Sequence, residues 1–254
     1  MYRELNKKRI ILEKRKPYTQ EAYEKIAEND LVDFVYTSLR LDGSQFSREM
    51  VEKILVEGGF SPDLSLEDHV KAHKYREVLS YLKGLYEMQT DISLPVITEI
   101  YSMISGDKTK SLRSDDPFIY EWNYRVPDHC GIRDSLNILV NWIGRDGKVY
   151  DRANPLETEG LKESPSDFIL RAAYLHDRLA VMYPYGRYSA SVARTVMYYY
   201  IMSKGYPVFE LETDQEQYND MIAEYAENGD VTPLYNCIAG SVLHKLESLM
   251  EITG

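Results

Sequence analysis

Hydrophobic positions recur three and four residues apart along most of the chain, and this spacing is typical of helices with one buried face. Thr19, Ser47 and Ser65 each precede such a run and fit the N-cap position, where a side-chain oxygen accepts from a free backbone N–H. The helices expected on this pattern cover residues 20–41, 65–88, 95–105, 134–143, 169–182, 192–203, 215–227 and 233–250, and a further helix begins after Ser47. The chain is therefore predicted to be an all-α bundle.

Two of these helices form the centre of the predicted fold. Pro184 ends the first of them, because its ring removes an N–H donor and clashes with the preceding turn. The second, residues 192–203, is apolar almost all the way round, which predicts a buried central helix. We expect Ser189 or Ser191 to cap it.

Two segments lack the helical pattern. Residues 106–131 read as a loop, with a short hairpin expected over residues 118–126. Residues 144–165 contain several glycines and prolines, and we expect a mobile loop between two packed helices.

The composition narrows the function classes. The net charge of −11 argues against a nucleic-acid-binding surface, which ordinarily needs a basic patch. No apolar run approaches the roughly 18 residues that span a bilayer, so we expect no membrane association. Only Cys130 and Cys237 occur, without the spacing of a metal site around either. We therefore expect no metal site and a reducing, cytoplasmic location.

The turn between the two central helices is the candidate site. The first N–H groups of a helix have no partner inside it, so a helix that begins at a sharp turn can bind an anion. The alternative interpretation is purely structural, with the helical hairpin only holding the core together.

The residues of this turn resemble the signature of the Fic (filamentation induced by cAMP) family, H-P-F-x-[D/E]-G-N-G-R-x-x-R. The chain reads YPYGRYSASVAR over residues 183–194, with His176 at the upstream histidine position and Gly205-Tyr206-Pro207 downstream. The resemblance extends over residues 30–250. It implies a Fic-type helical bundle with a short β-hairpin flap. We expect the basic N-terminus (1–17) to be a mobile arm, followed by an N-terminal helical part (18–90) and the core with its C-terminal helices (91–254).

The resemblance implies transfer of AMP from ATP to a protein hydroxyl, but this chain departs from the motif at the reactive positions. Tyr183 replaces the basic histidine, and a phenol is protonated at neutral pH. Arg187 replaces the acidic residue that holds Mg²⁺, so we expect no Mg²⁺. Residues 188–190 replace G-N-G. Ser191 replaces the first of the two motif arginines, and Arg194 matches the second.

A second motif lies near the end of the first long helix. Residues 38–44, SLRLDGS, resemble the family's inhibitory motif, [S/T]-x-x-x-E-[G/N], whose glutamate pairs with the second motif arginine. Ser38, Asp42 and Gly43 occupy its positions, so the resemblance pairs Asp42 with Arg194. A helix-end salt bridge without an inhibitory role is the alternative.

The hairpin carries Trp122, Tyr124 and Arg125, and the resemblance implies that a target or partner protein binds at this flap. The alternative is a surface loop that packs Trp122 into the core.

Two functional hypotheses follow. In the first, the chain is a pseudoenzyme-like binding module that recognises a protein or an anionic small molecule, with ATP as a candidate. Arg187, Ser189, Ser191 and Arg194 would bind the anion. In the second, it is a nucleotidyl- or phosphoryl-transferase with a non-standard site, in which Arg187 helps Tyr183 to ionise. A fold kept only for a structural contact is a third possibility. The tyrosine-rich helices also permit a homodimer.

Overall fold

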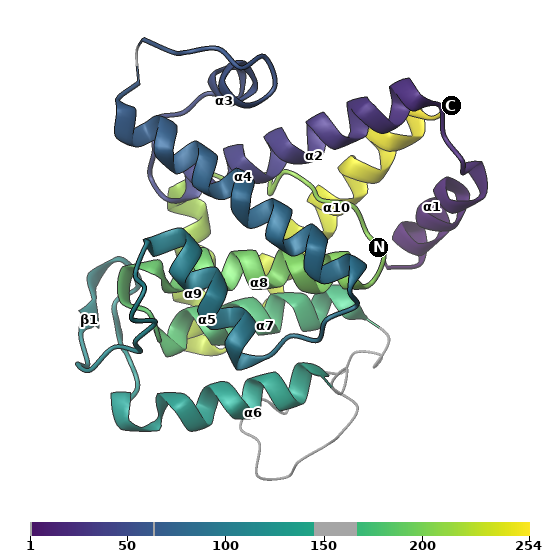
Figure 1. Cartoon of the computed structure of the whole chain (residues 1–254). Helices are drawn as coiled ribbons and strands as arrows, with labels where there is room; N and C mark the ends of the chain where they lie inside the picture. Colours follow the sequence, from purple (N-terminus) through teal and green to yellow (C-terminus); the bar gives the residue numbers. More distant parts are fainter. Residues whose placement is uncertain (1, 63, 145–166) are drawn as a thin grey trace.

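Helix α8 (Ser189–Ser203) crosses the middle of the molecule and is surrounded by other helices (Figure 1). Helix α7 (Phe168–Met182) runs beside it, and α4 (Leu66–Glu87) and α5 (Leu94–Ser105) also pack against it. The computed structural model describes residues 2–62, 64–144 and 167–254. Every side chain of α8 except those of Ala190 and Ser203 is buried, as the sequence predicts.

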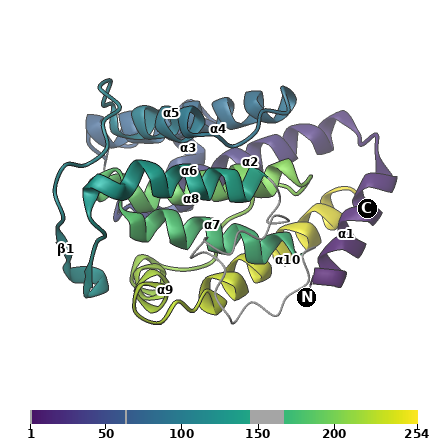
Figure 2. The same cartoon turned by 90° about the horizontal axis from the view of Figure 1, so that it is seen from below.

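The remaining helices enclose this centre. They are α1 (Tyr2–Arg15), α2 (Gln20–Leu41), α3 (Arg48–Leu55), α6 (Ile132–Gly144), α9 (Gln215–Asn228) and α10 (Thr232–Ile252), with short 3-10 turns η1 (Tyr120–Trp122), η2 (His129–Gly131) and η3 (Gly186–Tyr188). In Figure 2, α4 and α5 lie on one side of α7 and α8, and α9 and α10 on the other. The all-α prediction is confirmed.

The expected N-caps explain where three helices begin. The Thr19 hydroxyl accepts from Ala22 N, and the Ser47 hydroxyl accepts from Met50 N. Ser65 forms a full capping box, because the Asp68 carboxylate accepts from Ser65 N in return. These three predictions are confirmed.

A short antiparallel hairpin is the one sheet in the described residues. Strand β1 (Phe118–Ile119) pairs with β2 (Tyr124–Arg125), with Phe118 opposite Arg125 and Ile119 opposite Tyr124. This is the hairpin expected over residues 118–126. It lies at one end of the molecule, whereas the chain termini lie at the other (Figure 2).

The N-terminal segment differs from the expectation. Residues 1–17 were expected to be a mobile arm, but residues 2–15 form α1, which packs against α10. Leu5 and Leu12, seven positions apart, are both buried, and Arg15 Nη1 donates to Met250 O at 2.6 Å. Although most side chains of α1 are polar or charged, its buried leucines form a narrow apolar stripe that anchors the helix.

The insert expected over residues 144–165 lies, apart from Gly144 at the end of α6, outside the described residues. Across the three described ranges, no helix is both long and apolar enough to cross a membrane.

Candidate functional site

A cavity of about 600 Å³ opens where the end of α2, the side of α4, the hairpin, the start of α8 and α9 meet. Its walls carry both charges and several aromatic rings. The charged lining residues are Asp42, Glu67, Lys71, Lys74, Glu121 and Arg187, and the aromatic ones are Tyr75, Trp122, Tyr183, Tyr188 and Tyr218. The cavity therefore combines cationic donors with flat apolar surfaces.

Asp42 is held at the bottom of this cavity by three donors from other helices. Arg194 Nη2 lies 2.7 Å from Asp42 Oδ1, and the Ser191 hydroxyl donates to the same oxygen at 2.8 Å. The Tyr75 hydroxyl donates to Oδ2 in a short hydrogen bond. Asp42 is the C-cap of α2, and its backbone N–H bonds Ser38 O. The shorter aspartate thus reaches Arg194 directly, without water between the groups.

Arg194 is a buried cation with unfilled donors. Its side chain is only 1% exposed, and Nη2 also donates to Ser38 O at 3.2 Å. Nε and Nη1 have no hydrogen-bond partner within the described part of the chain. Burial alone would lower the pKa of this guanidinium, but the Asp42 carboxylate, together with the Tyr218 and Tyr75 phenols, more than offsets that effect and raises the pKa. Arg194 therefore stays charged.

The start of α8 differs from the expected cap. Tyr188 is the N-cap residue, without a side-chain hydrogen bond to the helix. Ser189 is fully buried, and its hydroxyl accepts from Tyr185 N at 3.0 Å, which tightens the preceding turn. Ser191 instead bonds Asp42. The capping prediction is wrong for both serines, and Ser189 lies outside the cavity lining.

Tyr183 ends α7 in a left-handed conformation with a φ of 52°. Its ring meets the Trp122 ring edge to face at 5.8 Å. Burial raises the pKa of the phenol, and the nearby Glu121 and Asp115 carboxylates raise it further. Arg187 donates to the Tyr188 hydroxyl at 2.9 Å, and its charge does not contribute to this shift. The expectation that Arg187 favours an ionised Tyr183 is therefore wrong.

The hairpin packs Trp122 into the core, as one interpretation expects, and partner binding at the flap stays a prediction. Trp122 is buried, and its Nε1 donates to Asn219 Oδ1 at 3.2 Å, so this ring fixes the hairpin to α9. Tyr124 is half-buried and Arg125 is exposed. The Tyr120 side chain, at the tip, is 84% exposed. The hairpin thus forms one wall of the cavity and presents an aromatic tip to solvent.

Sequence reasoning missed the chain of buried groups beneath the cavity. His176 Nδ1 lies 2.9 Å from Asp177 Oδ1, and Nε2 lies 2.6 Å from the Tyr218 hydroxyl. Burial lowers the pKa of His176 to about 3, with a further contribution from the Arg194 charge. Burial also raises the pKa of Asp177 and raises that of Tyr218 to about 12. His176 matched a motif position, but nothing in the sequence linked it to Tyr218.

Comparison with known proteins identifies the architecture. No protein-family model matches the chain. Two curated relatives, each named protein adenylyltransferase fic-1, from Caenorhabditis briggsae and Caenorhabditis elegans, are 21% identical over 214 residues. The match covers 81% of this chain and 38% of theirs, so the chain spans well under half of their length.

Solved structures agree over nearly the whole chain. A Fic domain containing signaling protein from Bacteroides thetaiotaomicron gives a TM-score of 0.78 at 15% identity and covers 98% of this chain and 97% of its own. Fic-1 from C. elegans gives 0.73 at 18% identity, covering 98% and 72%. A Fic family protein from Desulfovibrio desulfuricans gives 0.60 at 14% identity, covering 97% and 73%. These likenesses show the fold.

Proposed function

We propose that this chain, which has the Fic fold, is a pseudoenzyme-like module that binds a phosphate-bearing small molecule in the cavity at the start of α8. The observation that carries the proposal is Arg194. A buried guanidinium with unfilled donors is costly, because each unpaired group has lost its water without gaining a partner. An anion that reached Nε and Nη1 would satisfy both donors.

Asp42 controls access to that cation. Asp42 lines the cavity, whereas Arg194, which lies behind it, does not. The carboxylate therefore occupies the position that a ligand's anionic group would take. Movement of Asp42 would open Arg194 to the cavity, so we assign Ser38, Asp42 and Gly43 the role of an internal lock.

The walls support a ligand with both a phosphate and a flat apolar part. Lys71, Lys74 and Arg187 add positive charge at the cavity surface. Trp122 and Tyr183 form an aromatic wall on the hairpin side. A nucleotide such as ATP has this combination of charge and ring, and aromatic faces bind planar rings by stacking.

Several features argue against the usual AMP transfer. The phenol of Tyr183 keeps its proton, since burial and two carboxylates raise its pKa. Arg187, at the position that would hold Mg²⁺, carries a charge of the same sign as the metal. Binding in this proposal is consequently independent of Mg²⁺.

Calorimetric titration of the purified chain with ATP, in Mg²⁺ or in EDTA, tests the proposal. We expect binding in EDTA that weakens by at least about tenfold, about 1.4 kcal/mol, in Arg194→Met. Arg76→Ala, an exposed arginine on α4 away from the cavity lining, is the matched control and should bind like the wild type. Binding that requires Mg²⁺, or that survives Arg194→Met unchanged, would contradict the proposal.

A transferase with a non-standard site is the second candidate function, and one arrangement favours it. The low pKa of His176 leaves its imidazole neutral, and Nε2 lies 2.6 Å from the Tyr218 hydroxyl, whose ring lines the cavity. The neutral imidazole lies close enough to accept a proton, although a pKa of about 3 makes it a weak base, so geometry alone favours this candidate. Mass spectrometry that finds an AMP or phosphate adduct on a protein hydroxyl, lost in His176→Gln, would support this candidate over the binding module.

The proposal also includes a protein partner at the hairpin tip. Tyr120 is 84% exposed and Phe118 37% exposed, a concentration of apolar surface on a short two-stranded sheet. A partner strand could add to this edge. Light scattering would test the homodimer, which stays a prediction.

We place the protein in the cytoplasm, in keeping with two free cysteines.

A further inference from the structure

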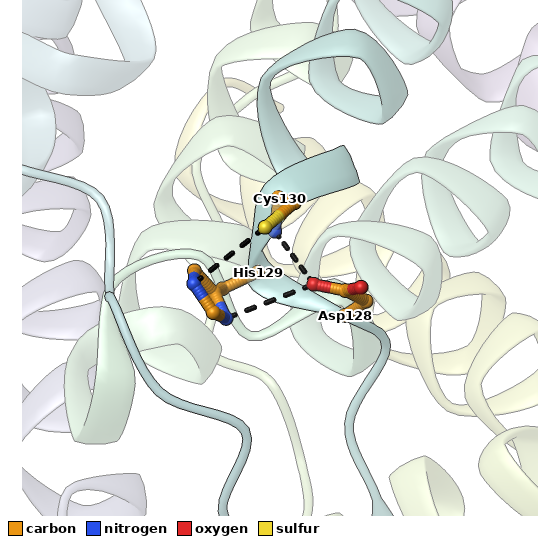
Figure 3. A group of neighbouring side chains, drawn as sticks. All are labelled: Asp128, His129 and Cys130. Carbon is orange, nitrogen blue, oxygen red and sulfur yellow. Dashed lines mark hydrogen bonds and ion pairs between the residues drawn. The ribbon is translucent and has the colours of Figure 1, made fainter.

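Three consecutive side chains at the base of the hairpin present three different metal-ligand types (Figure 3). One ligand atom from each of Asp128, His129 and Cys130 lies within 4.8 Å of the other two. His129 Nε2 is 3.7 Å from Cys130 Sγ, and His129 Nδ1 is 3.7 Å from Asp128 Oδ1. Tetrahedral zinc bonds of ~2.0–2.3 Å place neighbouring ligand atoms roughly 3.3–3.8 Å apart. His129 Nε2 and Cys130 Sγ already have this spacing, whereas the Asp128 carboxylate, which lies nearer Nδ1, would have to rotate toward Nε2 to join them around one cation.

A fourth residue, distant in sequence, orients the imidazole. Asp116 Oδ1 accepts from His129 N at 2.8 Å and lies 3.1 Å from His129 Nδ1. This contact places the ring proton on Nδ1 and leaves the lone pair of Nε2 facing Cys130 Sγ. Metal-binding histidines commonly donate their second nitrogen to a carboxylate in this way.

Asp116 is itself fixed from the protein interior. Arg113 Nη1 lies 2.6 Å from Asp116 Oδ1, and the Arg113 side chain is only 4% exposed. The same guanidinium donates to Pro127 O at 2.5 Å and to Tyr183 O at 3.0 Å. The supporting carboxylate is therefore held by a buried cation, whereas the three ligand groups remain accessible to solvent.

We propose that Asp128, His129 and Cys130 bind a divalent transition-metal ion of the zinc class, with Asp116 as the positioning residue. A thiolate, an imidazole and a carboxylate suit such an ion, whereas Mg²⁺ and Ca²⁺ prefer oxygen ligands alone. Three protein ligands leave a coordination position for water. The Cys130 thiol proton passes to solvent when the metal–sulfur bond forms.

The position of the site gives it a structural consequence. Asp116 precedes β1 and the three ligands follow β2, so they lie at the two ends of the hairpin segment. A bound cation would fix the His129 ring that bridges these ends. None of the four residues lines the cavity, so this proposal is independent of the proposed phosphate binding.

Cobalt titration of the purified full chain, with its thiols kept reduced by a phosphine, tests this inference. Co²⁺ should produce a thiolate-to-cobalt charge-transfer absorption that saturates at one equivalent and disappears when Zn²⁺ is added. The band should be lost in Cys130→Ser and retained in Cys237→Ser, the matched control at the other free cysteine. Asp116→Asn should weaken Zn²⁺ binding by about 10–100-fold.

Each opposite result would overturn the inference. Absence of the thiolate band in the wild type, or a band that persists in Cys130→Ser, would show that Cys130 is not a ligand. Unchanged affinity in Asp116→Asn would remove the positioning role. Circular dichroism of each variant checks the fold, which the exposed substitution at Cys130 should leave intact.

Discussion

Asp42 and Arg194 form a direct ion pair, Oδ1 to Nη2 at 2.7 Å, although 152 positions separate them in the sequence. Arg194 uses one nitrogen for this contact and keeps two donors unfilled. Asp42, in turn, accepts from Ser191 and Tyr75 as well as from Arg194. Asp42 is thus an anion of the chain itself that lines the cavity. It pairs with Arg194, whose Nε and Nη1 have no hydrogen-bond partner among the described residues.

The stability of the protein should depend on this pair. Asp42→Asn keeps the shape of the side chain but leaves the Arg194 charge without a counter-ion. Asp42 is 26% exposed, so water partly screens the pair. We therefore expect the free energy of unfolding, measured in urea, to fall by about 1–3 kcal/mol, less than for a fully buried pair. The exposed Asp220→Asn on α9 serves as control and should change stability by less than about 0.5 kcal/mol. Equal effects of the two substitutions would contradict the account.

Gly43 should be required for the position of Asp42. Its φ is +83°, and a Cβ added there would lie 2.9 Å from Gln215 Nε2. Gly43→Ala should therefore cost about 1–2 kcal/mol of backbone strain, plus a smaller amount for turning the flexible Gln215 side chain aside. Gly58→Ala provides the comparison, since Gly58 has a φ of +68° and nothing within 4 Å of its added Cβ. If the two variants lose equal stability, the contact with Gln215 is unimportant.

Tyr183 should titrate above the ordinary range for tyrosine. Burial and the Glu121 and Asp115 carboxylates disfavour the phenolate and so raise the pKa. NMR of ring-labelled tyrosine, assigned with Tyr183→Phe, should show the protonated phenol at neutral pH and up to about pH 10. A phenolate signal from Tyr183 near neutral pH would contradict this prediction and would mean that Tyr183 can act as a base.

Arg113 should anchor the hairpin to the end of α7. Its guanidinium donates to Tyr183 O, Pro127 O and Asp116 Oδ1 together. Arg113→Ala should lower the free energy of unfolding by about 2–4 kcal/mol and increase hydrogen exchange across residues 113–131. Arg113→Lys keeps the charge but not the planar fork, so it should recover only part of the loss. Full recovery by lysine would mean that charge alone holds the segment.

Much of the fold follows from local sequence signals. Thr19, Ser47 and Ser65 start helices because each can accept from a free N–H, and Pro184 ends α7 because it cannot donate. The pairing of Asp42 with Arg194 came from two motif resemblances. These features are visible in sequence because they depend on near neighbours or on a known pattern.

The contacts between residues that are distant in the sequence depend on which helices pack together. Tyr75 reaches Asp42 from α4, and Tyr218 reaches His176 from α9, and no spacing in the chain predicts either contact. Leu5 and Leu12 show that a basic segment can be anchored by two leucines, which a composition argument overlooks. Asp116 meets His129 in a similar way, because the hairpin brings the two residues together across 13 positions.

The most direct measurement compares ATP binding by the wild type and by Asp42→Ala, in EDTA, by calorimetry. If Asp42 occupies the site of a ligand's anionic group, its removal should tighten binding by at least about tenfold, about 1.4 kcal/mol. The double variant Asp42→Ala with Arg194→Met should then lose that gain. Equal affinity of the wild type and Asp42→Ala, or a gain that persists without Arg194, would contradict the account.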